Sequence, residues 1–230
     1  MTRIAVLSDI HGFINYYTES FSGVDLVILP GDFCSSDNIA DQEKEFKTLS
    51  DKLREMFPDA QDFIVVPGNH DYLLERIHLS NNTSKLDFCK LLGPKFSVLV
   101  DEKFTFLNLL NGETIRLYGN PRTDLYMAFP HTWNCNDIKR IPPGIDILIT
   151  HEAPRWYGLS CIKDSIGDYG DSEPGNYFLY QAVLKIKPKI HVFGHIHRFC
   201  EGSNENTTFY NCSQMFGNEF TPNVRIIEYH

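Results

Sequence analysis

Residues 3–12 read RIAVLSDIHG, an apolar run that passes directly into a polar motif. The run is short, rich in β-branched residues and apolar at successive positions, which is typical of a strand covered on both faces. The same order recurs at four later places, with apolar runs at residues 25–30, 62–67, 145–150 and 189–193. Such strands favour an open α/β arrangement, in which ligands bind outside the carboxyl ends of the strands.

The five polar motifs supply carboxylate, amide and imidazole side chains. They are Asp9-Ile10-His11, Gly31-Asp32, Gly68-Asn69-His70-Asp71, Thr150-His151-Glu152 and Gly194-His195-Ile196-His197. Side chains of these types, gathered at one sheet edge, indicate a two-metal centre of the kind that hydrolyses phosphate esters. Mixed imidazole and carboxylate ligation suits zinc, iron or manganese.

The order of the motifs suggests which residues share an ion. Asp32 is the natural bridge between two ions, because a carboxylate can bind both. Asp9 and His11 lie on alternate positions of one extended segment and would bind the first ion with His197. The second ion would take Asn69, His151 and His195. The remaining histidines are interpreted as structural or exposed, and they are His78, His131, His191 and His230.

Length and composition predict one globular domain over residues 1–230. The chain is 42% hydrophobic and 22% charged, and it has no linker rich in Gly, Ser or Pro. Its net charge of −9 argues against a general nucleic-acid binder, which normally presents a basic face. The sequence gives no indication of the oligomeric state.

The cysteines and the apolar runs predict a cytoplasmic protein. The six cysteines show no zinc-ligand spacing, and no signal peptide precedes Ile4, so free thiols in a reducing compartment are expected. Every apolar run is far shorter than the ~20 residues that a membrane span needs. We therefore expect no membrane association.

Periodicity predicts three helices, at residues 38–57, 84–92 and 177–186. Ser36 or Asp37 is expected to cap the first, and Pro58 to stop it. Three consecutive strands are expected at residues 97–100, 104–107 and 114–118, with a hairpin turn at Asn111-Gly112. Two more are expected at residues 208–211 and 225–229. Together these elements predict a mixed α/β fold of two sheets packed face to face, with helices outside.

The motifs resemble those of the calcineurin-like metallophosphoesterase family, whose pattern is D-x-H, G-D, G-N-H-[DE], H and G-H-x-H. The resemblance extends from Ile4 to about Ser213 and fills every ligand position. It implies a four-layer sandwich of two mixed β-sheets flanked by helices. It also implies one ion on Asp9, His11, Asp32 and His197, and a second on Asp32, Asn69, His151 and His195. His70 would contact phosphate and protonate the leaving group, and Asp71 would orient its imidazole.

Other stretches bear on the substrate class. Serine/threonine protein phosphatases of this superfamily continue the second motif as G-D-x-x-D-R-G, whereas residues 31–37 read GDFCSSD. The stretches 118–121, 147–151, 191–197 and 209–213 are more similar to small metallophosphoesterase-domain phosphodiesterases related to class III cyclic-nucleotide phosphodiesterases. This resemblance implies hydrolysis of a small or cyclic nucleotide by a metal-bridging hydroxide, with two divalent ions. Mn²⁺ is the first choice, and Fe, Zn or Mg are alternatives.

Several residues could contact the substrate. Asn69, Arg122, Trp156 and Tyr157 follow or precede ligand motifs, and the two adjacent rings could stack on a base. Arg155 and Arg198 could also reach a phosphate. Cys34 is interpreted as a small buried residue, with an additional ligand as the alternative, and residues 165–176 as a rim or an exposed loop.

Two other functions stay open. The same ions would serve a phosphomonoesterase or nucleotide pyrophosphatase that acts on a metabolite or protein. A non-catalytic metal-binding scaffold is the third possibility, although such a protein is expected to have lost ligands.

Overall fold

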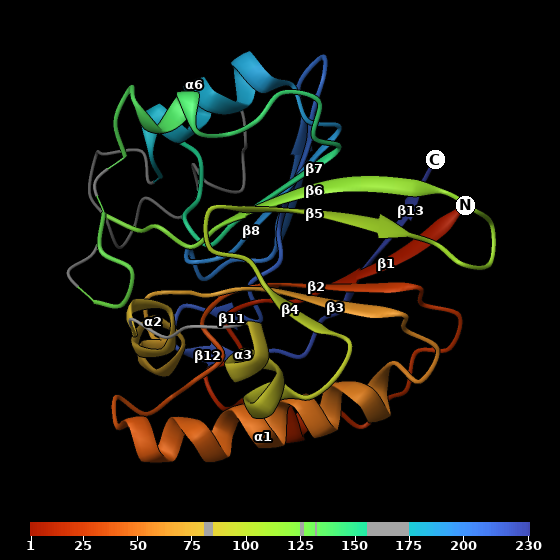
Figure 1. The fold of residues 1–230 in the computed structure, drawn as a ribbon, viewed down its shortest axis with the longest axis vertical. Helices are drawn as coiled ribbons and strands as arrows, with labels where there is room; N and C mark the ends of the chain where they lie inside the picture. The colour runs from red at the N-terminus through yellow and green to blue at the C-terminus, as the bar shows by residue number, and fades with distance from the viewer. Residues whose placement is uncertain (81–84, 125–126, 132, 156–174) are drawn as a thin grey trace.

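The computed structural model describes residues 1–80, 85–124, 127–131, 133–155 and 175–230. The elements form four layers, in which two β-sheets face each other and helices cover the outer face of each sheet (Figure 1). This confirms the predicted sandwich of two sheets flanked by helices.

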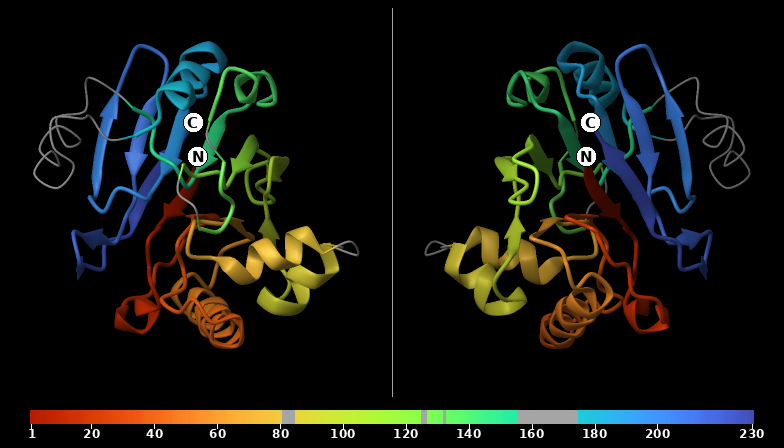
Figure 2. Two further views of the ribbon diagram at one scale, coloured as in Figure 1. Left: turned by 90° about the vertical axis from the view of Figure 1, so that its left-hand side faces the viewer. Right: turned by 90° about the vertical axis from the view of Figure 1, so that its right-hand side faces the viewer.

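The first sheet has the strand order β13-β1-β2-β3-β4. Its strands are β1 (Thr2–Val6), β2 (Leu26–Pro30), β3 (Asp62–Val66), β4 (Phe96–Val98) and β13 (Arg225–Tyr229). β13 runs antiparallel to β1, and the other neighbours are parallel. Thr2 pairs with Tyr229, so the two ends of the chain lie together (Figure 2).

The second sheet has the order β5-β6-β7-β8-β10-β9. Its strands are β5 (Glu102–Leu107), β6 (Thr114–Asn120), β7 (Ile147–Thr150), β8 (Ile190–Phe193), β9 (Cys200–Ser203) and β10 (Thr208–Asn211). A small hairpin of β11 (Met215–Phe216) and β12 (Glu219–Phe220) stands apart from both sheets.

The helices lie on the two outer faces. They are the short 3₁₀ helices η1 (Phe13–Tyr16) and η2 (Asp137–Lys139), and the α-helices α1 (Ile39–Met56), α2 (Tyr72–Leu79), α3 (Lys85–Leu92) and α6 (Tyr177–Ile186). In Figure 1, α1, α2 and α3 lie below the first sheet and α6 lies above the second.

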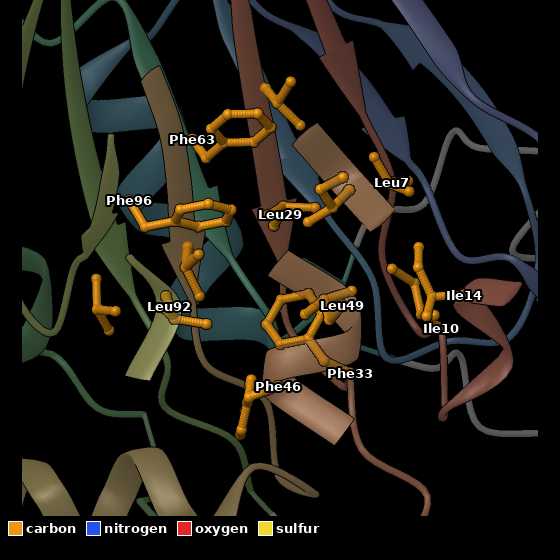
Figure 3. Packing of buried hydrophobic residues seen from close by; sticks show 14 of the residues in the cluster. Leu7, Ile10, Ile14, Leu29, Phe33, Phe46, Leu49, Phe63, Leu92 and Phe96 are labelled. Atoms are coloured by element: carbon orange, nitrogen blue, oxygen red, sulfur yellow. The ribbon is translucent and has the colours of Figure 1, made fainter. Parts of the chain in front are cut away.

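The buried apolar residues form three clusters, one at each boundary between layers. Alternation along a strand places successive side chains on opposite faces. Ala5 of β1 therefore packs toward the helices, and Ile4 and Val6 pack between the sheets. Figure 3 shows part of the cluster between the first sheet and its helices, where the rings of Phe63 and Phe96 are stacked with centroids 4.5 Å apart.

The structure corrects three sequence-based expectations. The expected meander at residues 97–118 is divided between the sheets, because β4 pairs with β3 whereas β5 and β6 form a hairpin in the other sheet. Asn38 caps α1, with its side chain accepting hydrogen bonds from the backbone N–H groups of Ala40 and Asp41, in place of Ser36 or Asp37. Helix α2, which follows Asp71, was not predicted.

Candidate metal centre

The five polar motifs meet at one edge of the two sheets. They follow the carboxyl ends of β1, β2 and β3 in the first sheet and of β7 and β8 in the second. Four of the predicted ligands, Asp9, His11, Asp32 and His195, have positive φ values of 53°, 44°, 58° and 68°. This conformation is costly for residues with a Cβ, and its concentration here is typical of a functional site.

Asp9, His11 and His197 form a group able to hold an ion, with ligand atoms within 4.8 Å of one another. The Nε2 atoms of His11 and His197 lie 3.3 Å apart. The Asp9 carboxylate lies 3.7 Å from His197 Nε2 and accepts the backbone N–H of His195. Asp9 is fully buried, so a cation is the partner that this group of atoms favours.

Asp32, His151 and His195 form a second such group. His151 Nδ1 lies 2.8 Å from the Pro30 carbonyl oxygen, which can only accept, so this nitrogen carries the proton. Nε2 then presents a lone pair toward the Asp32 Oδ2 and Asn69 Oδ1 atoms, at 3.2 Å and 2.9 Å. Three electron-rich atoms that face one another fit a bound cation.

Asp32 lies between the two groups. Its Oδ2 atom is 3.2 Å from His151 Nε2 and 3.8 Å from His11 Nε2. Its Oδ1 atom accepts the backbone N–H of His70 at 2.9 Å. Asp32, His11 and His70 make a third group of adjacent ligand atoms. Asp32 therefore lies at the position where the sequence predicts a bridging ligand.

The electrostatics favour neutral imidazoles at His11 and His195, an ionised carboxylate at Asp32 and, without a metal ion, a protonated imidazole at His151. Burial lowers the pKa of His11, and burial together with His151 lowers that of His195 to about 4. Burial would also lower the pKa of His151, but the Asp32 carboxylate outweighs it and raises this pKa to about 10. The neighbouring His151 holds the pKa of Asp32 below its usual range despite burial. A divalent ion at the His151 nitrogen would replace the proton that Asp32 attracts there.

Asp71 has different hydrogen-bond partners from the one predicted. Its carboxylate accepts three backbone N–H groups, from Asp32 at 3.0 Å, Phe33 at 3.0 Å and Gly68 at 2.7 Å. It therefore fixes the loops after β2 and β3, and the expectation that it orients the His70 imidazole is corrected. His70 stays in the site, with its ring centroid 4.9 Å from that of His11.

The predicted substrate-contact residues differ in where they lie and in what they contact. Asn69 lies in the site, whereas Arg122 is wrong as a free phosphate ligand because its guanidinium pairs with the carboxylates of Asp101 and Asp137. Trp156, Tyr157 and residues 165–174 lie outside the described residues.

Cys34 is buried, and burial raises the pKa of its thiol, so it is not in the thiolate form that binds metals. Among the described residues, five cysteines are free: Cys34, Cys89, Cys135, Cys200 and Cys212. No helix in the described part of the chain is both long and apolar enough to cross a membrane.

Sequence reasoning missed three contributors to the site. The Ser8 hydroxyl donates to Asp9, and the Gly217 carbonyl accepts from His197. Glu152 lies with its Oε2 atom 4.0 Å from His195 Nε2, and burial raises its pKa to about 7. Ser8 and Glu152 adjoin predicted ligands in sequence, which is a signal that could have found them. Gly217 has no such signal in the sequence.

Comparisons with known proteins give relatives along most of the chain. UPF0046 protein K07C11.7 of Caenorhabditis elegans is 27% identical over 220 residues, which cover 92% of this chain and 69% of that protein. Metallophosphoesterase domain-containing protein 1 of Homo sapiens is 26% identical over 231 residues, covering 91% of this chain and 64% of that protein.

A solved structure shares the fold. Phosphopantetheinyl hydrolase of Mycobacterium tuberculosis superposes with a TM-score of 0.56 at 13% identity, covering 92% of this chain and 89% of that one. The family model for calcineurin-like phosphoesterases matches residues 2–199, which include all five motifs. The chain therefore belongs to the calcineurin-like phosphoesterase family, whose members use binuclear divalent metal centres.

Proposed function

We propose that this protein is a dimetal-dependent phosphodiesterase that acts on a small or cyclic nucleotide. One observation carries the proposal: the Asp32 carboxylate lies between two sets of imidazole ligands, within 3.8 Å of a nitrogen from each. One ion would be held by Asp9, His11, Asp32 and His197. The other would be held by Asp32, Asn69, His151 and His195.

When bound, two divalent ions lower the pKa of water from ~16 toward ~7 and offset the charge of a phosphate ester. The chain's own residues hold that site in place. The backbone N–H groups of the loops after β2 and β3 donate to Asp71, and Pro30 fixes the His151 ring. His70 lies beside His11 and Asp32 and would give a proton to the leaving oxygen.

The charges around the site support a diester over a monoester. A monoester carries about one more negative charge than a diester and gains more from an additional cationic side chain. Arg122, one of three arginines considered for that contact, is paired with Asp101 and Asp137. In the described part of the site, the side chains that lie within 4.0 Å of the carboxylates of Asp9, Asp32 and Glu152 include His197, His11, His151 and His195.

Hydrolysis of bis-p-nitrophenyl phosphate and p-nitrophenyl phosphate with added Mn²⁺ tests the proposal. We expect faster cleavage of the diester, and loss of at least about 10³-fold in kcat for Asp32→Ala, since one oxygen ligand serves both ions. Asp62→Ala is the matched control, because Asp62 lies at the opposite end of β3 from the motifs.

Preference for the monoester would instead support the phosphomonoesterase or pyrophosphatase function. Failure to cleave either ester with any divalent ion, while ions still bind, would support the scaffold function. Cyclic nucleotides are the next substrates after a positive result with the diester.

A further inference from the structure

The β11–β12 hairpin contacts His197 through Gly217, which lies twenty positions further along the chain. Gly217, between the two strands, accepts a hydrogen bond from His197 Nδ1 at 2.8 Å. The Gly217 backbone N–H also donates to the His197 carbonyl at 3.2 Å. Because a carbonyl can only accept, Nδ1 carries the proton and Nε2 keeps its lone pair. The hairpin thus selects the tautomer in which Nε2 faces Asp9 and His11.

Gln214 anchors the hairpin at its base. This side chain is buried, and its Oε1 atom accepts from the Tyr17 hydroxyl at 2.7 Å and from the Asn223 backbone N–H at 2.5 Å. Its backbone N–H donates to the Ser8 carbonyl at 2.9 Å, next to Asp9. Gln214 therefore joins the hairpin to the end of β1 and to η1.

Aromatic contacts reinforce this connection. The ring of Phe220 stacks on Phe13 at 5.0 Å and meets Tyr17 edge-on at 5.8 Å. Helix η1 begins two residues after His11, and Gly12 between them has a left-handed backbone conformation with a φ of +78°. Figure 2 shows the hairpin, in blue, on the same flank as the red segment that contains η1. The hairpin thus contacts the segments that carry both His11 and His197.

We propose that the β11–β12 hairpin, held by the hydrogen bond between Tyr17 and Gln214, positions the ligands of one ion. It sets the tautomer of His197 and the 3.3 Å spacing between the His11 and His197 nitrogens. Tyr17 and Gln214 are positioning residues, because they act through these two ligands. The inference rests on the two-ion site of the proposed function. It concerns an element that lies beyond residues 2–199, the part matched by the family model.

Tyr17→Phe is the sharpest test, since it removes one hydroxyl and keeps the ring against Phe220. Calorimetric titration of the metal-free protein with Mn²⁺ should resolve two affinities. We expect one to fall about 10-fold or more, as is typical when an outer partner of a ligating histidine is lost, and the other to stay unchanged. Gln214→Ala should weaken the same site further. In both variants, the absorption spectrum of Co²⁺ bound at that site should change, and the spectrum of Co²⁺ bound at the other site should not.

Tyr118→Phe is the matched control. Tyr118 is buried like Tyr17, and its hydroxyl donates to Asp101 in another layer of the fold. This variant should bind both ions with wild-type affinity. Wild-type affinity at both sites in folded Tyr17→Phe, checked by circular dichroism, would overturn the inference. Equal weakening by Tyr118→Phe would overturn it too.

The two proposals can fail separately. If the wild type binds two ions and Tyr17→Phe loses affinity at one, while neither ester is cleaved, the hairpin inference stands and the phosphodiesterase is rejected. If the diester is cleaved while Tyr17→Phe binds both ions normally, only the hairpin inference is rejected.

Discussion

At the scale of single residues, the site depends on how closely its loops approach one another. A Cβ atom on Gly68 would lie 2.2 Å from Asp32 Oδ1 and 2.4 Å from the Asp32 backbone nitrogen. A Cβ atom on Gly31 would lie 2.4 Å from His151 Nδ1. Glycine at these two positions is therefore a steric requirement of the metal site.

Gly68→Ala should displace the Asp32 carboxylate. We expect it to lower the free energy of unfolding by about 1–3 kcal/mol, as overpacking does, and to weaken binding of both ions. Urea unfolding and Mn²⁺ titration measure the two effects. Gly112→Ala is the control, because no atom lies within 4 Å of its Cβ position and only its positive φ is strained. Unchanged metal binding in Gly68→Ala would contradict the prediction.

The burial of His191 leads us to expect that the stability of the protein depends on pH. Its Nε2 atom lies 2.9 Å from the Thr150 hydroxyl, which donates to the Glu152 carbonyl, so Nε2 is the donor to this hydroxyl. The buried Nδ1 has no hydrogen-bond partner among the described residues. Burial lowers the pKa of His191 from 6.5 to about 3. Between these values the unfolded chain binds a proton that the folded protein does not, so stability falls as the pH falls.

His191→Phe should remove this dependence. We expect the loss of unfolding free energy from pH 6 to pH 4 to become shallower by up to about 1.4 kcal/mol per pH unit. Urea unfolding at several pH values measures the slope. His230→Phe, at the exposed end of the chain, should leave the slope as it is. Identical slopes for His191→Phe and the wild type would rule out this account.

At the scale of elements, charged clusters fasten loops to the sheets. Arg122 follows β6 and pairs with Asp101, before β5, and with Asp137 of η2 at 2.7 Å. The Arg122 side chain is 16% exposed and that of Asp137 is 2% exposed. Removal of one partner from such a cluster leaves buried charge uncompensated.

Arg122→Ala should therefore lower the stability of the protein. We expect a loss of about 3 kcal/mol in unfolding free energy, and no change in KM for the diester. Arg116→Ala is the control, because the Arg116 side chain is 60% exposed beside Asp146 and its loss should destabilise the protein much less. A raised KM with unchanged stability would restore Arg122 as a substrate ligand.

At the scale of the whole molecule, the two sheets place carboxylates and imidazoles from distant parts of the chain at one edge. Buried Asp9 and Asp32 add to a net charge of −9. Ions that bind only the folded state stabilise it by mass action. The metal centre should therefore also be a stabilising element.

Mn²⁺ should raise the Tm of the metal-free protein. A free ion concentration 100-fold above Kd contributes about 2.7 kcal/mol, which corresponds to about 5–10 °C for a domain of this size. Thermal unfolding followed by circular dichroism, with EDTA and then with Mn²⁺, measures the shift. Asp32→Ala should show a much smaller shift. Equal Tm values for the wild type in the two conditions would show that the site does not hold ions.

The sequence alone determined the layers and was enough to predict a ligand set, because both predictions depend on local patterns. Apolar runs predicted the buried strands, and the residues after them predicted Asp9, Asp32, His151 and the other candidate ligands at strand ends. Helix α6 and strands β10 and β13 occupy the predicted residues, since their periods and flanking turns are clear.

Only the tertiary structure decided how these side chains are used. The pairing of β4 with β3, the three N–H groups at Asp71 and the carboxylates at Arg122 join residues from different segments. No local pattern encodes such contacts, because they follow from which loops meet when the sheets pack. For the same reason, the hydrogen bond from His197 to Gly217 could not be predicted, because it depends on a hairpin that folds back to the site.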